Sequence, residues 1–168
     1  MGMNNNLLEI ERKFLVDHKK MPRDLTIFKK SEISQGYIYC NPTIRVRNID
    51  DKYVLTVKST NKDNFDNVIE GLVRKEFEID IEKTVYDDLL KKCEGLIIYK
   101  TRYYIPYEKH TIELDIFKNE YNGLIVAEVE FENVKEAERF LIPNWFLKEI
   151  TNNKEYTNAS LSKGILKF

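Results

Sequence analysis

Cysteine is scarce in this chain of 168 residues, which has only Cys40 and Cys93. Two cysteines so far apart form neither a disulfide framework nor the spacing of a zinc site, and we expect two buried or half-buried free thiols. The chain has no apolar run long enough to cross a bilayer. The polar stretch 1–6 is followed by no cleavable secretory segment, and Asn6 stands where a myristoylation signal has Ser or Thr. These absences predict a reduced, cytoplasmic protein without a membrane partner.

An excess of positive charge is also missing. The chain has 27 Lys and Arg against 28 Asp and Glu, a formal net charge of −1. This balance argues against a partner such as nucleic acid bound without sequence preference, which requires a basic face. The hydrophobic share of 42% is that of an ordinary globular protein, and there is no internal repeat or low-complexity linker. We therefore expect one domain, residues 1–168.

Alternation of apolar and polar residues with period two dominates the chain and predicts strands. Helical periodicity is confined to three short stretches. A segment rich in Asn, Asp and Lys, residues 59–71, is predicted to be a loop. The eight predicted strands cover residues 7–16, 35–40, 43–49, 53–58, 73–82, 97–105, 110–117 and 125–132, and the helices cover residues 84–93 (with Thr84 as cap), 134–141 and 157–163. Many strands and few helices indicate an α+β, mostly β fold with an antiparallel sheet.

The polar phase of these strands is unusually rich in charge. Glu9, Glu11 and Lys13 share one face of the first strand, and Arg45 and Arg47 share one face of the third. Seven cations and nine carboxylates recur in this way: Lys13, Arg45, Arg47, Lys58, Arg74, Lys100 and Arg102; and Glu9, Glu11, Glu76, Glu78, Glu113, Asp115, Glu128, Glu130 and Glu132.

A charged strand face usually meets water, and for any one strand that interpretation is favoured. The charged faces of all the strands, taken together, favour another interpretation. Several faces carry charge of only one sign, and paired glutamates repel each other unless a cation lies between them. The apolar residues that alternate with the charged ones must also be shielded from water, and three short helices can bury only part of them. An eight-stranded antiparallel closed β-barrel with a charged lumen and a few flanking helices satisfies these conditions and leaves room for one small ligand.

Such a lumen would bring together the two halves of a phosphoryl-transfer site. Carboxylates from several strands are hard oxygen ligands suited to Mg²⁺ or Mn²⁺. Arginine and lysine from other strands present donors to phosphate oxygens. We therefore expect a metal-dependent enzyme acting on a small phosphate compound.

Read in order, the charged blocks resemble the CYTH superfamily, the triphosphate tunnel metalloenzymes, and in particular its bacterial inorganic triphosphatase-like branch. The first block has the ExExK pattern in Glu9, Glu11 and Lys13. The later blocks follow over nearly the whole chain: Gln35-Gly36-Tyr37, Arg45-Val46-Arg47, Thr56-Val57-Lys58, Arg74 to Glu78, Lys100-Thr101-Arg102-Tyr103, Glu113 to Phe117, Ala127 to Glu130, and Glu149-Ile150-Thr151 with Tyr156 and Asn158. The resemblance implies an antiparallel tunnel of eight strands open at both ends, and a homodimer.

The resemblance also assigns roles to individual residues. The final block departs from the family in having Glu155 where a basic residue commonly precedes the tyrosine, so the charge is carried over to Lys154. Tyr37 and Lys13 are expected to assist the departure of the product, although aromatic residues in strands are commonly packing residues. The implied sets are Glu9, Glu11, Glu113, Asp115, Glu128 and Glu130 for two Mg²⁺ or Mn²⁺ ions per site; Lys13, Arg45, Arg47, Lys58, Arg74, Lys100, Arg102 and Lys154 for substrate; and Lys13, Tyr37, Glu76 and Glu78 for catalysis.

Hydrolysis of inorganic triphosphate to diphosphate and phosphate is the activity that the resemblance favours. Alternatives in the same fold are a class IV-type adenylate cyclase, a thiamine triphosphatase or another nucleoside or organic triphosphatase. An alternative of another class is a module that binds polyphosphate without chemistry, although binding alone would be better served without the paired glutamates. His18 and His110 have no partner at ligand spacing and are expected at the surface, and Trp145 is expected in the core.

Overall fold

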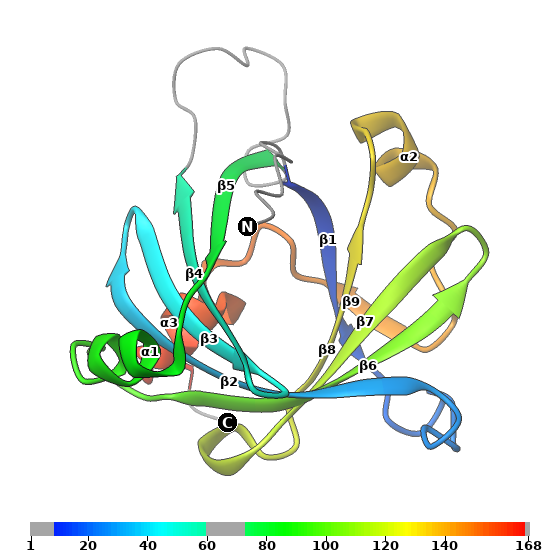
Figure 1. Ribbon diagram of the computed structural model, residues 1–168. Coiled ribbons are helices and arrows are strands. Elements are labelled where there is room, and N and C mark those ends of the chain that lie inside the picture. Colours follow the sequence, from blue (N-terminus) through cyan, green and yellow to red (C-terminus); the bar gives the residue numbers. More distant parts are fainter. Residues whose placement is uncertain (1–8, 60–72, 167–168) are drawn as a thin grey trace.

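The protein folds as one strongly curved, antiparallel sheet with three short helices (Figure 1). The computed structural model describes residues 9–59 and 73–166, and side chains within 10–58 and 76–166. The expected loop at 59–71 lies almost entirely outside these ranges. Among the described helices, none is long and apolar enough to span a bilayer.

The mostly β, antiparallel architecture predicted from the alternation is confirmed, but the sheet has nine strands where eight were expected. The additional strand is β9, whose four residues are too few for alternation to show. The strands are β1 (Glu9–Val16), β2 (Lys29–Cys40), β3 (Thr43–Ile49), β4 (Lys52–Ser59), β5 (Val73–Asp80), β6 (Ile98–Tyr107), β7 (His110–Phe117), β8 (Ile125–Glu130) and β9 (Phe146–Glu149); the α-helices are α1 (Lys83–Leu90), α2 (Val134–Arg139) and α3 (Asn158–Ser162), and the 3₁₀ turns are η1 (Asn119–Tyr121) and η2 (Lys154–Tyr156).

Strand β2 and helix α1 differ from the prediction at their ends, and α1 stops at Leu90, three residues before the predicted end at residue 93. Strand β2 begins six residues before the predicted start, because Lys29, Lys30 and Glu32 obscure the alternation at its exposed N-terminal end. Helix α1 is preceded by Glu82 as its N-cap residue, so Thr84 is not the cap. The other predicted strands and helices agree with the structure to within two residues at each described end.

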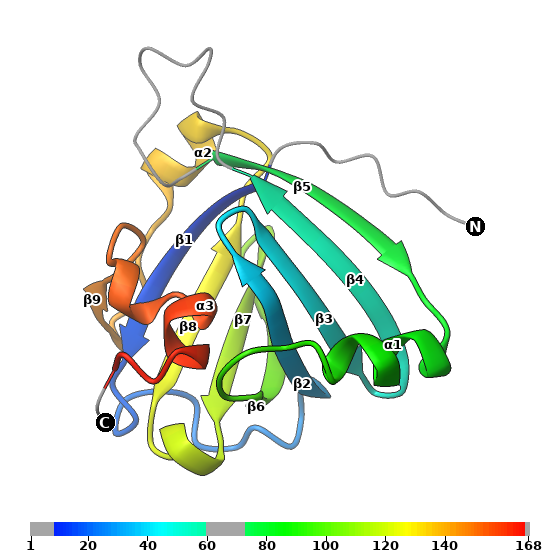
Figure 2. The ribbon, with the colours of Figure 1, turned by 90° about the vertical axis from the view of Figure 1, so that its left-hand side faces the viewer.

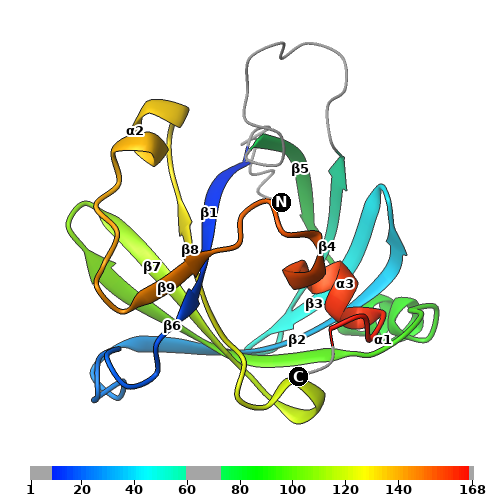
Figure 3. The same ribbon diagram turned by 180° about the vertical axis from the view of Figure 1, so that it is seen from behind.

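The strands follow the order β5-β4-β3-β2-β6-β7-β8-β1-β9, and every pairing is antiparallel. Strand β5 also pairs with β1, through Glu9 opposite Arg74 and Ile10 opposite Val73. These two strands meet at one end and diverge toward the other, and α3 lies between them where they have diverged (Figure 2). Seen from behind, the sheet curves around a central space (Figure 3). Charged residues of β1 and of β3 to β8 line a cavity on this concave side.

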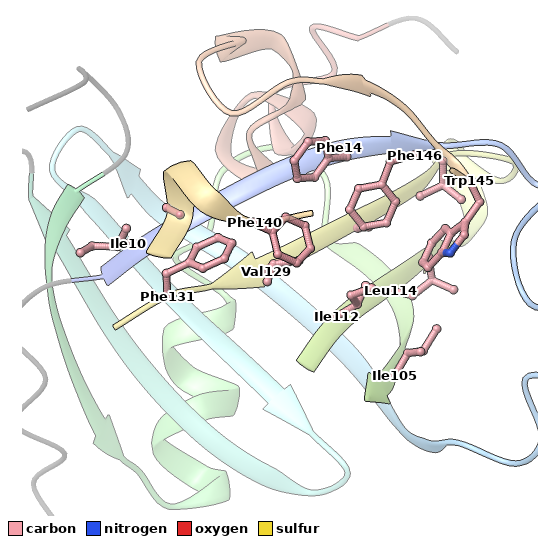
Figure 4. Close-up of a cluster of buried hydrophobic side chains, with 13 residues drawn as sticks. Ile10, Phe14, Ile105, Ile112, Leu114, Val129, Phe131, Phe140, Trp145 and Phe146 are labelled. Atoms are coloured by element: carbon pink, nitrogen blue, oxygen red, sulfur yellow. The ribbon is translucent and has the colours of Figure 1, made fainter. Parts of the chain in front are cut away.

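The larger hydrophobic core covers the convex face of β1, β7 and β8 (Figure 4). Phe14 packs against Phe146, with ring centroids 4.6 Å apart, and Phe131 packs against Phe140 at 5.3 Å. Trp145 is buried there as expected. His110 was expected at the surface but is half-buried, because its ring packs against Phe131 and Phe140.

A second apolar cluster occupies one end of the concave face. Val126 lies opposite Leu15 of β1 and two residues before Glu128, so period two places it on the charged face. It packs with Ile98 and Phe117 and with Leu161 of α3, which is fully buried. This end is therefore filled by side chains, where the resemblance implied an opening.

Candidate active site

A cavity of about 560 Å³ lies on the concave face, beside the second apolar cluster. Strands supply most of its lining, and the segment that begins α3 closes one side. The lining residues are Glu11, Lys13, Ile33, Tyr37, Thr43, Arg45, Arg47, Ile49, Lys58, Glu76, Glu78, Arg102, Tyr104, Glu113, Glu128, Glu130, Thr157, Asn158 and Ala159.

One wall of the cavity is acidic and comes from three neighbouring strands. Glu11 of β1 lies opposite Glu130 of β8, and Glu113 of β7 lies opposite Glu128. Like charges directly opposite each other destabilise a sheet unless cations neutralise them. Lys13 of β1 supplies part of that neutralisation, since its Nζ lies 2.7 Å from Oε1 of Glu128.

The two opposed glutamates Glu113 and Glu128 differ in protonation behaviour. Burial by itself would raise the pKa of Glu128, but Lys13, Arg102 and Lys100 outweigh burial and hold that pKa well below its usual value. Burial raises the pKa of Glu113, and repulsion by Glu128 and Asp115 adds to the effect, although Arg102 opposes it. Arg102 also pairs with Glu113 through Nη1, but this one cation does not outweigh burial and the neighbouring carboxylates.

The opposite wall is basic and comes from β3 and β4. Period two places Arg45 and Arg47 on the concave face of β3, and Lys58 of β4 lies opposite Thr43. Strand β5 supplies the carboxylates that hold two of these cations. Nζ of Lys58 lies 3.1 Å from Glu76, and Nη2 of Arg45 lies 3.5 Å from Glu78.

Arg47 is the cation with the least compensation in this wall. Its Nε is buried without a hydrogen-bond acceptor, as is Nε of Arg45, and it makes no ion pair with any carboxylate of the described residues. Burial, together with the positive charge of Arg45 and Arg102, lowers the pKa of Arg47 to about 10. A buried guanidinium in this state would be stabilised by a bound anion.

Behind the cavity lining, Asp115 anchors Arg102. Both Asp115 oxygens accept hydrogen bonds from Arg102, at 2.7 Å each, and Lys100 also contacts the carboxylate. Arg102 also reaches the acidic wall, where its Nη2 lies 2.6 Å from Glu128 and its Nη1 pairs with Glu113. Burial and the charge of Arg102 lower the pKa of Lys100 to about 8. Arg102 is thereby fixed in one orientation at the boundary of the two walls.

Most of the residues that the sequence singled out are brought together in this cavity. Three are not. Asp115 and Lys100 are fully buried behind Arg102 and do not line the cavity, so Asp115 is not open to a metal ion in this arrangement. Lys154 is exposed in η2 and is not a lining residue. The side chains of Glu9 and Arg74 lie outside the described residues, although their backbones pair.

The structure adds residues to which the sequence reasoning assigned no role, although Gln35, Thr56 and Asn158 lie within the family blocks. Gln35 is fully buried beside Tyr37, and Thr56 donates a hydrogen bond of 2.7 Å to Glu78. Tyr104, Thr43, Thr157 and Asn158 line the cavity. Period two from Tyr37, Lys58 and Arg102 could have indicated Gln35, Thr56 and Tyr104 respectively. No local signal indicated that the segment at Thr157 would cross the sheet.

The acidic wall fits a divalent cation in its donor chemistry. Glu11, Glu113, Glu128 and Glu130 occupy adjoining positions on three strands, and carboxylate oxygens are the ligands that hard cations prefer. In the part of the chain that the structure describes, no three acidic, His or Cys side chains converge as they would around an ion. Glu128 is held in ion pairs with Lys13 and Arg102. Binding a cation there would require these side chains to rotate.

The curved sheet and its two-walled cavity define a protein that can hold a small, highly charged anion beside a cation. Residues 7–163 match the CYTH domain, and the chain belongs to the CYTH family. The resemblance drawn from the charged blocks is thereby confirmed.

Three relatives of known description are similar over nearly their whole length. An inorganic triphosphatase of Nitrosomonas europaea is 34% identical over 170 residues, covering 95% of this chain and 99% of that protein. An inorganic triphosphatase of Acetivibrio thermocellus is 34% identical over 158 residues, covering 92% and 93%. A crystal structure of an inorganic triphosphatase superimposes with a TM-score of 0.64 at 31% identity, covering 92% of this chain and 94% of that one.

Proposed function

We propose that this chain is a hydrolase that cleaves inorganic triphosphate to diphosphate and phosphate. The observation that carries the proposal is the separation of charge within one cavity, with Arg45, Arg47 and Lys58 on one wall and four glutamates on the other. A condensed phosphate needs cationic donors for its oxygens and a counter-cation for its remaining charge. The family and the two curated relatives described as inorganic triphosphatases support the same activity.

Arg47 and Arg45 bind phosphate oxygens in this proposal, because their buried Nε atoms lack acceptors and the surrounding positive charge favours an anion. Lys58 and Lys13 add positive charge from β4 and β1. Arg102 binds where the two walls meet, held from behind by Asp115, whose carboxylate also contacts Lys100. This assigns Asp115 and Lys100 to the positioning of Arg102 rather than to direct contact with metal or substrate.

Glu76 and Glu78 keep Lys58 and Arg45 in place, since Glu76 forms ion pairs with both cations and Glu78 forms one with Arg45. Tyr37 lines the cavity with its hydroxyl beside Gln35, and we assign it, with Lys13, to the stabilisation of the leaving diphosphate. Buried, fixed donors of this kind stabilise developing charge without reorganising during the reaction.

The divalent cations would be held by the glutamates of the acidic wall, and we propose two Mg²⁺ or Mn²⁺ ions per site. These ligands are Glu11, Glu113, Glu128 and Glu130, together with Glu9 from the same strand as Glu11. The chemistry that such ions supply is neutralisation of phosphate charge and activation of the attacking water. Burial and the negative charge of Glu128 and Asp115 raise the pKa of Glu113 even though Arg102 pairs with it, which supports a cation at this wall.

We further propose that the sheet closes into a tunnel-like barrel through β1 and β5, with the entire chain as one domain. The pairing of Glu9 with Arg74 and of Ile10 with Val73 supports closure at one end. A homodimer is expected from the resemblance, and sedimentation of the purified chain tests it.

Release of phosphate from triphosphate, ATP and thiamine triphosphate, each with Mg²⁺ or Mn²⁺, tests the proposal. Preference for inorganic triphosphate is the expected result. Preferred cleavage of either organic substrate would replace it with a nucleoside or thiamine triphosphatase, and formation of cyclic AMP would indicate a cyclase. Tight binding of triphosphate without release under every condition would indicate a module that only binds.

A further inference from the structure

Gln35 is a polar side chain with an unusual environment. It lies in the middle of β2, between Arg47 of β3 and Ile98 of β6, and none of its surface is exposed. Its Oε1 is buried without a hydrogen-bond partner. A buried amide oxygen without a donor is destabilising, so glutamine is an unfavourable residue at this position if stability alone is considered.

The amide nitrogen of Gln35 has one partner, the hydroxyl of Tyr37. Nε2 donates to Oη over 2.9 Å, and both side chains lie on the concave face because they are two residues apart on one strand. Tyr37 is 3% exposed and lines the cavity, whereas Gln35 does not. Gln35 therefore contacts the cavity only through Tyr37.

The direction of this hydrogen bond determines where the tyrosine proton can go. A phenol has one O–H donor, and its oxygen accepts through its lone pairs. Because the Gln35 amide donates to the oxygen, the O–H cannot point at Gln35. The guanidinium of Arg45 is also close enough to interact electrostatically with the Tyr37 hydroxyl, and it likewise offers only donors. The O–H is left to point into the cavity.

We propose that Gln35 is a positioning residue that holds the Tyr37 hydroxyl with its O–H directed at the bound substrate. This inference rests on the proposed function, since it assigns Tyr37 a donor role toward a phosphate oxygen in the same cavity. Gln35 itself does not touch the substrate. Without it, the hydroxyl rotor is free to turn, and the donor is correctly oriented only part of the time.

A double-mutant cycle tests the inference. Gln35→Met keeps the length and volume of the side chain but removes the donor, and we expect kcat for triphosphate to fall about tenfold with KM changed less than about twofold. In a Tyr37→Phe background the same substitution should have no further effect on kcat, because there is no hydroxyl left to orient. A loss of equal size in both backgrounds would overturn the inference, as would an unchanged kcat in Gln35→Met alone.

The matched control is Ser34→Ala, one residue away on the opposite face of β2, where the Ser34 hydroxyl lies 3.3 Å from that of Tyr86. We expect kcat of Ser34→Ala to equal that of the wild type. If Gln35→Met does not fold, as judged by circular dichroism, Gln35→Leu removes the same donor and completes the same cycle.

A second readout does not depend on catalysis. With ¹³Cζ-labelled tyrosine, the Tyr37 resonance is identified by its disappearance in Tyr37→Phe, and we expect that resonance to shift in Gln35→Met and to stay in place in Ser34→Ala. An unchanged Tyr37 resonance in Gln35→Met would contradict the hydrogen bond on which the inference depends. If the resonance shifts in Gln35→Met but the wild type does not hydrolyse triphosphate, the hydrogen bond stands while the proposed function fails. The donor role of Tyr37 toward substrate would then be overturned.

Discussion

Asp115 holds Arg102 from behind the cavity wall, with Oδ1 accepting from Nε and Oδ2 accepting from Nη2, both at 2.7 Å. The carboxylate is completely buried and also contacts Lys100, so one anion serves two buried cations. Arg102 then reaches Glu128 on the acidic wall. The most buried part of the site is therefore a chain of alternating charges, and the loss of one member leaves its partners uncompensated.

Asp115→Asn should lower the free energy of unfolding by about 3 kcal/mol, because it removes the carboxylate that pairs with Lys100 and anchors Arg102 in the buried part of the site. It should also raise KM, since Arg102 loses its fixed orientation. Denaturant unfolding and triphosphate kinetics measure the two effects. Asp88→Asn is the control, because it breaks only the exposed pair with Lys91 and should leave the free energy of unfolding nearly unchanged. Equal effects of both substitutions would contradict the anchoring role.

Glu128→Gln should reduce triphosphate hydrolysis by roughly 100-fold or more at ordinary Mg²⁺, because it removes a carboxylate from the acidic wall and the partner of Lys13. Raising the metal concentration should restore part of the activity if Glu128 is a ligand. Glu138→Gln, on the exposed surface of α2, is the matched control and should be fully active. Near-wild-type turnover of Glu128→Gln would remove the metal assignment.

Arg47→Met should raise KM for triphosphate about tenfold or more, because the guanidinium is the least compensated cation of the basic wall and a charged hydrogen bond is lost. The same substitution should leave the chain at least as stable as the wild type without ligand, since it removes a buried charge. Thermal unfolding with and without triphosphate measures both effects. If triphosphate stabilised Arg47→Met as strongly as the wild type, Arg47 would not bind the substrate.

The raised pKa of Glu113 makes a prediction about pH. The folded state binds the Glu113 proton more tightly than the unfolded state, so its contribution to stability is fully present below the unfolded pKa of 4.5 and is lost as the pH rises through the folded pKa. In a chelating buffer, the wild type should therefore lose unfolding free energy relative to Glu113→Gln as the pH rises above about 4.5. Parallel curves for the two proteins would show that Glu113 is neutralised without a metal ion.

Leu161→Ala should lower the free energy of unfolding by about 3 kcal/mol, because Leu161 is fully buried in the apolar cluster that fills one end of the concave face. Leu147→Ala, at a side chain that is 62% exposed, should cost less than about 0.5 kcal/mol. Denaturant titrations compare the two. A small effect at Leu161 would mean that α3 is not a structural part of this end.

The sequence by itself determined which side chains share a face. Alternation is a local property of extended backbone, so the placement of Arg45 with Arg47 and of Glu128 with Glu130 followed from period two, and most of the lining residues could be named in advance. The ordered blocks determined the family for the same reason, because each block is a short local pattern.

Strand order and register decided the rest, because they depend on contacts between residues far apart in the chain. Glu113 and Asp115 share a face of β7, but β6 brings Arg102 opposite Asp115, so Asp115 is buried in ion pairs while Glu113 lines the cavity. Lys154 is kept out by the path of the chain after β9, which presents Thr157 and Asn158 to the cavity instead. The path of this segment could not be predicted from a local sequence pattern. It depends on the packing of Leu161 against strands more than thirty residues away in the chain.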